Sequence, residues 1–321
     1  MLCIFVRIDL NKKMIYMVDV RKKNVLLGLM IVLLSAIFIL TQCSFENKDT
    51  SGREVKQIFP QRFIPQVPNE MIFADEKVPT DRWNVYEAFD RELLYNYNSP
   101  GNITYVMKLS FRYFPFIEQR LKDNGIPDDF KYLCVAESNL QNQVSRVGAA
   151  GFWQFMKETA SGYNLEVNDS IDERYDLEKS TDAACKYFLA AYQKFGNWTA
   201  AAASYNCGMA GYSNFSTFQQ SKYFYDLQLP DETNKYIYRI LTFKYLMTNA
   251  KKMGLDINEE NGYKPLKTQS IMVDATIPDL AEWAIKNNTT YKFIKILNPW
   301  LRGRSLPVLN GKTYTIKVLD N

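Results

Sequence analysis

Glu137-Ser138, followed by Gly148-Ala149-Ala150-Gly151-Phe152-Trp153-Gln154-Phe155-Met156, is the stretch that decides how this chain is interpreted. The whole sequence of 321 residues contains no histidine. Without imidazole, Ser-His-Asp and Cys-His nucleophile systems and most zinc sites are excluded. Proton transfer at neutral pH therefore falls to a perturbed carboxyl, thiol, amine or phenol, and Glu137 is the best placed carboxyl.

Glu137 falls on the apolar face of a predicted helix. Pro127 favours a helix start, because a proline at the first helical position loses no hydrogen bond, and Asp128 and Asp129 suit the positive end of the helix dipole. The stripe at i, i+3, i+4 and i+7 consists of Phe130, Leu133, Cys134 and Glu137. Burial disfavours a charged carboxylate, so we expect a raised pKa, which suits a general acid. A helix cap or a buried ion pair is the alternative interpretation.

The charge is uneven along the chain. Residues 1–42 carry six basic and two acidic residues. The difference equals the formal net charge of +4 for the whole sequence. The remainder is formally neutral, so a nucleic-acid partner has no electrostatic support. The sequence shows no metal cluster, and it predicts no cofactor.

The first 42 residues are predicted to be a signal or membrane-targeting segment. Arg21-Lys22-Lys23 precedes the apolar run 25–40, which is shorter than the about 20 residues of a spanning helix. Cys43 follows directly and resembles the lipidated cysteine of a bacterial lipoprotein signal, although Gln42 replaces the expected small residue. We therefore expect an exported protein of the cell envelope or periplasm, attached to a membrane through a lipid; an uncleaved anchor and plain secretion are the alternatives.

The remaining sequence divides into three parts. Residues 43–80 are polar and proline-punctuated, which predicts a linker. Helical periodicity runs through 81–250, with helices expected at 81–93, 103–122 (with a kink or restart at Pro115), 181–195 and 233–250, and predicts a mainly α domain. In the last part, 265–321, strands at 270–273 and 314–318 and helices at 277–287 and 291–297 predict a small α+β module. Apart from Cys3 and Cys43, three cysteines allow at most one disulfide, and the sequence does not choose among Cys134, Cys185 and Cys207.

Several motifs in order resemble the lytic transglycosylases of the goose-lysozyme-like (SLT) superfamily, specifically the membrane-bound D type. Two departures from the family pattern are Lys157 and Cys207. The matching motifs are Glu137-Ser138, the glycine-rich segment 148–156, Asp172-Glu173-Arg174-Tyr175-Asp176, Ser204-Tyr205-Asn206-Cys207-Gly208, and Leu229-Pro230-Asp231-Glu232-Thr233 with Tyr236.

The resemblance implies a lysozyme-like α-helical domain that cleaves peptidoglycan glycan strands. Glu137 would act as acid and then as base, producing 1,6-anhydro ends without water. The implied substrate-binding residues are Ser138, Gly151, Gln154, Tyr205, Asn206 and Tyr236, and Arg174 with Asp176 is expected to form a structural ion pair. The alternatives are a noncatalytic peptidoglycan-binding or scaffold protein and a hydrolytic muramidase.

The C-terminal module resembles a LysM domain. The resemblance is carried by the run 276–284, by Leu297-Asn298-Pro299, by Gly311 and by the last strand. It implies binding to N-acetylglucosamine chains, and a packing module without ligand is the alternative.

Overall fold

The computed structural model describes residues 63–255, 257–309 and 311–320. The predicted leader 1–42, the predicted lipidation site Cys43 and the first part of the predicted linker lie outside these ranges. Within them, no helix combines the length and the apolar character that crossing a membrane requires.

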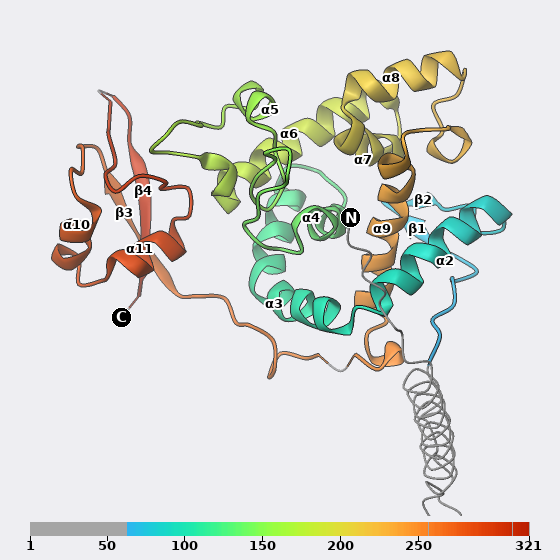
Figure 1. The fold of residues 1–321 in the computed structure, drawn as a ribbon, viewed down its shortest axis with the longest axis horizontal. Coiled ribbons are helices and arrows are strands. Elements are labelled where there is room, and N and C mark those ends of the chain that lie inside the picture. Colours follow the sequence, from blue (N-terminus) through green and yellow to red (C-terminus); the bar gives the residue numbers. More distant parts are fainter. Residues whose placement is uncertain (1–62, 256, 310, 321) are drawn as a thin grey trace, which may run out of the picture. The chain divides into compact units, whose positions relative to one another are not determined.

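Helices make up most of the chain from residue 83 to residue 248 (Figure 1), which confirms the predicted mainly α domain. Three short 3-10 turns separate or follow them: η1 (Glu173–Tyr175), η2 (Phe224–Asp226) and η3 (Lys251–Met253). The helices are α2 (Trp83–Tyr97), α3 (Pro100–Asp123), α4 (Phe130–Ser138), α5 (Lys157–Gly162), α6 (Leu177–Phe195), α7 (Trp198–Cys207), α8 (Met209–Phe218) and α9 (Asp231–Thr248). α3 continues through Pro115 as one helix, where the sequence predicted a kink or restart.

The short helix α4 lies among longer helices (Figure 1) and is buried along most of its length. Phe130 anchors its first turn. The Phe130 ring lies 4.5 Å from Phe188 of α6 and 5.4 Å from Trp198 of α7, measured between ring centroids. A helix surrounded in this way gives its last residues a fixed position, because core side chains are packed as densely as in a crystal.

The predicted start of α4 at Pro127 is corrected to Phe130. Pro127–Asp129 form a turn, in which the Phe130 amide donates to the Pro127 carbonyl at 3.1 Å. The Asp129 carboxylate does not cap its own helix. It accepts a hydrogen bond from the Ala74 amide at 2.7 Å and pairs with Lys244 of α9 at 2.7 Å. Asp129 therefore joins distant segments of the chain.

The segment 63–80, predicted as part of a linker, belongs to the folded domain. Its apolar side chains, among them Val67, Phe73 and Val78, are buried in the main core. β1 (Ile72–Phe73) and β2 (Glu76–Lys77) form a small antiparallel hairpin. Glu76 accepts hydrogen bonds from the amides of Trp198 and Thr199 at 2.5 and 2.9 Å, and so satisfies the free N–H groups at the start of α7.

The C-terminal module is a two-stranded sheet with two helices, as predicted. β3 (Thr268–Val273) pairs antiparallel with β4 (Tyr314–Leu319), and Ile271 lies opposite Ile316. α10 (Leu280–Lys286) and α11 (Tyr291–Leu297) come between the strands in sequence (Figure 1). Buried residues of the module, among them Leu280, Ile294 and Ile316, form a second hydrophobic cluster. This cluster also includes Ala150, Ile171 and Tyr175 of the preceding domain.

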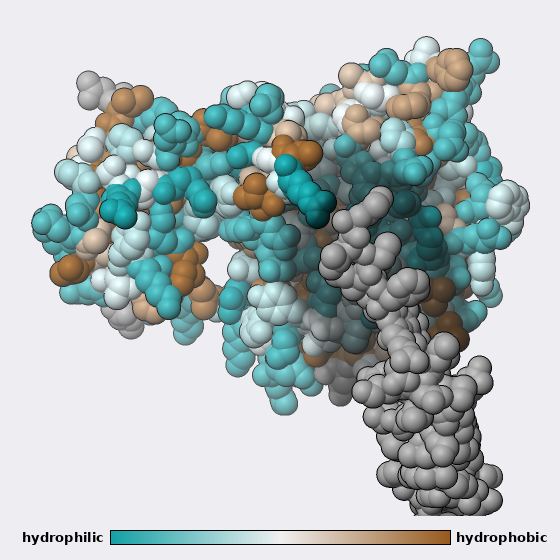
Figure 2. Space-filling view, in the orientation of Figure 1, coloured by the Kyte–Doolittle hydropathy of each residue, from teal (hydrophilic) through white to brown (hydrophobic). Residues whose placement is uncertain are grey.

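The visible face in Figure 2 is mostly hydrophilic over the described residues, and hydrophobic residues form small separate patches there. Scattered exposed apolar side chains are normal on a folded protein. This face therefore gives no evidence of a large apolar contact surface.

Candidate active site

Glu137 lies in the last turn of α4. The helix ends because Asn139 and Leu140 adopt left-handed backbone conformations, with φ of 52° and 56°. The residue as a whole is half-buried. The negative end of the α4 dipole adds to the cost of ionising a carboxylate at this position.

The partner of Glu137 comes from α9. The Tyr236 hydroxyl donates a hydrogen bond to Glu137 Oε1, and Tyr236 itself is buried, with 1% of its surface exposed. A buried tyrosine in this position fixes the carboxyl group and cannot easily turn to solvent. The structure thus brings together two residues that the sequence placed 99 positions apart.

Burial raises the pKa of Glu137 to about 7, although the Tyr236 hydroxyl and the positive charge of Arg239 both act to lower it. The Glu232 carboxylate acts to raise it further. A carboxyl group with this pKa exists in both protonation states near neutral pH, which is the requirement for a residue that first donates and then accepts a proton.

Arg239 holds the other carboxylates near the site. Its guanidinium donates to Glu232 Oε1 at 2.8 Å and lies 3.6 Å from the buried Glu92 carboxylate of α2. Glu232, the carboxylate with an effect on the Glu137 pKa, is therefore already engaged in an ion pair. Glu92 and Glu232 are both paired with Arg239, which favours a reaction that uses the Glu137 carboxyl group alone.

Tyr205 and Asn206 lie at the end of α7. The Tyr205 hydroxyl donates to the Trp153 carbonyl at 2.7 Å, and the Thr233 hydroxyl donates to Asn206 Oδ1 at 2.7 Å. Burial and the nearby Glu137 carboxylate raise the pKa of Tyr205, so its hydroxyl stays neutral. Asn206 keeps its amide group as a donor, because Nδ2 has no hydrogen bond to any described residue.

Gly151 is required by the packing of the glycine-rich segment. It has a φ of 83°, and a Cβ at this position would lie 1.8 Å from the Arg174 carbonyl oxygen. The residue is buried, and its backbone faces that carbonyl. Gly151 therefore lies at a close contact between two protein segments, and its role in this structure is to permit that contact.

Gln154 has a left-handed φ of 49° and is half-buried. Its Nε2 donates to the Gly151 carbonyl at 2.8 Å and to the Gln143 carbonyl at 3.1 Å. These two bonds fix the carboxamide, and its oxygen accepts no hydrogen bond from the described residues. That oxygen is a candidate acceptor for a substrate hydroxyl or amide.

Other side chains of the motifs point into the protein. Ser138 is buried, and its hydroxyl donates to the Cys134 carbonyl at 3.2 Å within its own helix. Phe152 and Trp153 are buried core residues, and Trp153 Nε1 donates to the Thr181 hydroxyl at 2.9 Å. The side chains of Ser138, Phe152 and Trp153 therefore belong to the protein interior.

The described cysteines are free thiols and are poor candidates for proton transfer. Burial and the Glu137 charge raise the pKa of Cys134 well above its usual range, and burial raises that of Cys185 to about 12. Burial also raises the pKa of Cys207. All three therefore stay protonated at neutral pH.

The predicted ion pair of Arg174 with Asp176 is wrong in its partner. Arg174 makes a two-pronged contact with Asp172, at 2.7 and 2.9 Å, and donates to the carbonyls of Gly148 and Phe155. Asp176 instead caps α6 by accepting from the amides of Glu178 and Lys179. The spacing Asp-x-Arg-x-Asp fits either pairing, and only the fold decides between them.

The sequence reasoning missed Arg239 and Glu92. A signal for Arg239 existed, since it follows Tyr236 by three residues and Glu232 by seven, which places them along one side of a helix. Nothing in the local pattern pointed to Glu92, because its contact depends on α2 lying against α9. Among the described residues, no group of three potential metal-ligating side chains is placed to hold a metal ion.

Comparison with known protein families finds two matching domains in this chain. Residues 114–224 match the family described as transglycosylase SLT domain, and residues 269–320 match the soluble lytic transglycosylase C-terminal LysM-like domain. The first match includes Glu137, Gly151, Gln154 and Tyr205, whereas Tyr236 lies beyond it. The fold is therefore that of a lysozyme-like SLT domain followed by a LysM-like module.

Two curated relatives carry the name of the membrane-bound D type. The chain is 25% identical over 217 residues to membrane-bound lytic murein transglycosylase D of Escherichia coli strain K12, and equally to the protein of the same name from E. coli O6:H1. It is a homologue of these proteins. The match covers 64% of this chain and 47% of each relative, so the chain spans about half the length of the curated relatives it matches.

Proposed function

We propose that this protein is a peptidoglycan lytic transglycosylase that uses Glu137 as its only acid and base. The observation that carries the proposal is the state of Glu137. This half-buried residue accepts a hydrogen bond from the Tyr236 hydroxyl, and its pKa is about 7. The matched SLT domain and the homologous murein transglycosylases support the same reaction class.

In the first step, protonated Glu137 gives its proton to the oxygen between N-acetylmuramic acid and N-acetylglucosamine. The bond from C1 to that oxygen breaks, and an oxocarbenium-like centre develops at C1, supported by the 2-acetamido group of the same sugar. Glu137 is then ionised. The Tyr236 hydroxyl stabilises this carboxylate, because a hydrogen bond donated to a charged acceptor favours the charged form.

In the second step, the Glu137 carboxylate takes the proton from the C6 hydroxyl of the muramic acid. The C6 oxygen attacks C1 and closes a 1,6-anhydro ring, and Glu137 returns to its protonated state. No water is consumed. We assign Gln154, Tyr205 and Asn206 to substrate positioning, as the resemblance implies. The Gln154 oxygen and the Asn206 amide nitrogen have no hydrogen-bond partner among the described residues, which supports this role for these two. We assign Ser138 and Gly151 to structural support.

The test is digestion of purified sacculi by the wild type and by Glu137→Gln, with the products analysed by mass spectrometry. We expect anhydro ends, lighter by one water than reducing ends, from the wild type and no cleavage by the variant. Hydrated reducing ends would identify a hydrolase. Full turnover by Glu137→Gln would remove this residue from the mechanism, and an inactive wild type would favour a noncatalytic binding protein.

We propose that the C-terminal module binds the glycan strand and holds the enzyme on its polymer. A pocket of about 310 Å³ lies between β3 and α10 and is lined by Trp283, Pro278 and polar residues such as Asp279. Aromatic and polar groups together suit a sugar, which has both apolar faces and hydroxyls. Deletion of residues 265–321 should reduce sedimentation with sacculi, and undiminished sedimentation would refute this role.

We propose that the protein acts in the cell envelope, where peptidoglycan is found, and that Cys43 carries a lipid anchor. The support is the pattern of the first 43 residues, together with the membrane-bound character named for the relatives. Labelling with a radioactive fatty acid should mark the wild type and not Cys43→Ser. Equal labelling of both proteins would contradict the assignment.

A further inference from the structure

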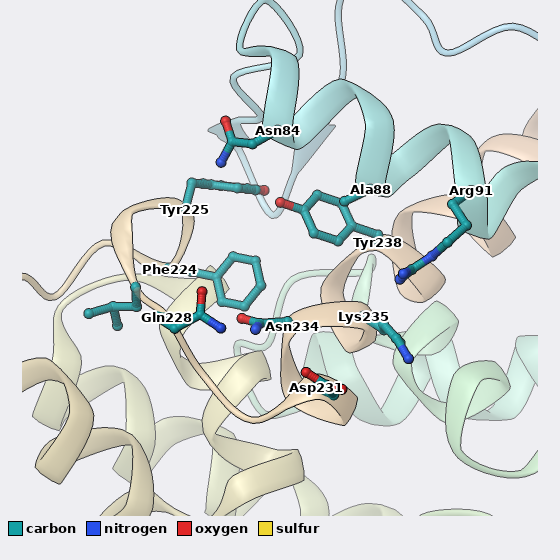
Figure 3. Close-up of a pocket in the computed structure, with 11 residues that line it drawn as sticks. Asn84, Ala88, Arg91, Phe224, Tyr225, Gln228, Asp231, Asn234, Lys235 and Tyr238 are labelled. Carbon is teal, nitrogen blue, oxygen red and sulfur yellow. The ribbon is translucent and has the colours of Figure 1, made fainter.

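A second pocket, of about 340 Å³, lies between α2, the loop that contains η2, and the first turns of α9 (Figure 3). Its size is at the lower end of the range of about 300–1,000 Å³ that is usual for ligand sites. Glu137, Tyr205 and Gln154 do not line it. It is therefore separate from the candidate active site, although both use α9.

The walls of this pocket are held in place by specific hydrogen bonds. The Asn234 carboxamide makes two bonds with the backbone of Leu229, at 3.1 and 2.6 Å, and the Gln219 carboxamide makes two with the backbone of Gln228, at 2.8 and 2.9 Å. Arg82 ties the same loop to the start of α2 through Asp226 at 2.6 Å. A pocket fixed in this way loses little entropy when a ligand binds.

Two cations face this pocket from different helices. Figure 3 shows the guanidinium of Arg91 and the ammonium of Lys235 on the same side of the pocket. Lys235 is half-buried and has no ion-pair partner among the described residues. Arg91 is only loosely paired, with Glu92 at 3.3 Å. Such a pair of available donors is suited to a carboxylate ligand.

The opposite side of the pocket is aromatic, and two of its three rings carry hydroxyl groups. The rings of Phe224 and Tyr238 lie 6.0 Å apart, and Tyr225 lies 5.2 Å from Phe224, measured between centroids. All three residues are buried. These rings form a surface for small apolar groups such as methyls. Asp231, which is exposed and also unpaired among the described residues, adds one anionic group at the rim for an amine.

We propose that this pocket binds the peptide branch of peptidoglycan, with its carboxylates at Arg91 and Lys235. The inference rests on the proposed function, because it names a second part of the same substrate. A short peptide of small residues with carboxylates and an amine has the charge pattern and the apolar groups that the pocket complements. A glycan strand alone offers no such carboxylate beyond the muramic acid ether group.

Both sites use α9, through the neighbouring residues Lys235 and Tyr236. Tyr236 and Lys235 are neighbours in the helix, so their side chains diverge by about 100° around its axis. A substrate with its glycan at Glu137 has to pass around a helix about 10 Å wide to reach Lys235. A branch of four residues spans about 13 Å when extended.

The test measures binding in the Glu137→Gln background, so that cleavage plays no part. The probes are two purified disaccharides, one carrying the tetrapeptide branch and one without a peptide, and calorimetry gives the dissociation constant of each. We expect the parent to bind the peptide-bearing disaccharide about tenfold more tightly, as charge-assisted contacts of this kind predict. Arg91→Gln combined with Lys235→Gln should abolish the preference and leave the affinity for the peptide-free sugar as in the parent.

Lys122→Gln, which removes an exposed cation at the end of α3, is the matched control and should keep the preference. Equal affinities of the parent for both disaccharides, or a preference that survives the double substitution, would overturn the inference. A wild type that cleaves neither substrate would refute the proposed function instead, since the binding comparison does not depend on turnover.

Discussion

Replacing Glu137 with glutamine should stabilise the folded protein in mildly alkaline solution. Burial raises the pKa of Glu137 from an ordinary value of 4.5 to about 7. Because the pKa is higher in the folded state, folding favours the protonated form. This contribution to stability is fully present below pH 4.5 and is lost as the pH rises through 7. Glutamine has the same shape and does not ionise, so it avoids the loss.

The size of the effect follows from the two pKa values. At about 1.4 kcal/mol for each pH unit, the interval between 4.5 and about 7 corresponds to about 3 kcal/mol. The free energy of unfolding of Glu137→Gln, relative to the wild type, should therefore rise by up to about 3 kcal/mol between pH 4 and pH 8. This figure is an upper value, because Glu137 is only half-buried.

The assay is urea unfolding followed by tryptophan fluorescence at pH 4 and at pH 8, for the wild type and Glu137→Gln. Glu87→Gln, which changes an exposed glutamate of α2, is the control and should show no such trend. A stability difference between wild type and Glu137→Gln that is the same at both pH values would refute the reasoning. So would a difference that favours the wild type at pH 8, because the charged carboxylate would then stabilise the fold.

Two further predictions concern Tyr236, the hydrogen-bond partner of Glu137, and Gly151 of the glycine-rich segment. Tyr236→Phe removes the hydroxyl that stabilises ionised Glu137, so the pKa of Glu137 should rise by about one pH unit or more; the alkaline limb of the activity profile should move to higher pH, and an unmoved limb would contradict this. Gly151→Ala places a methyl group 1.8 Å from the Arg174 carbonyl oxygen and should destabilise the fold by about 3 kcal/mol or more in thermal unfolding. Gly148→Ala, with a φ of 88° but open space around it, should cost only the backbone strain of about 1–2 kcal/mol, and equal losses in both variants would argue against the close contact.

The fold was predictable where local signals were strong. The helix α11 (Tyr291–Leu297) matches its predicted range, and α9 and the two strands of the C-terminal module lie within two residues of theirs or extend them slightly. Periodicity and turn residues encode such elements locally. The segment 63–80 has neither, and its burial comes from contacts with distant helices, as the Glu76 bonds to the start of α7 show. A proline-punctuated polar segment gives no sign of such contacts.

The raised pKa of Glu137 was predictable from the sequence, whereas the arrangement of the residues around it was predictable only in part. The position of Glu137 on an apolar stripe gave the reason for its raised pKa without any coordinates. The hydrogen bond from Tyr236 and the placement of Arg239 between Glu232 and Glu92 depend on how α9 packs against α4 and α2. Single-sequence reasoning has no access to that packing, which is also why the partner of Arg174 was misassigned.

The helix α9 presents Tyr236 to Glu137, and its first residues also form a wall of the second pocket. Inserting one residue between Pro230 and Tyr236 would turn every later side chain by about 100° relative to the start of the helix. The tyrosine would then leave its carboxyl partner even though each amino acid was retained. The length of this short interval therefore constrains the contact of Tyr236 with Glu137 as strictly as the identity of any single side chain in it.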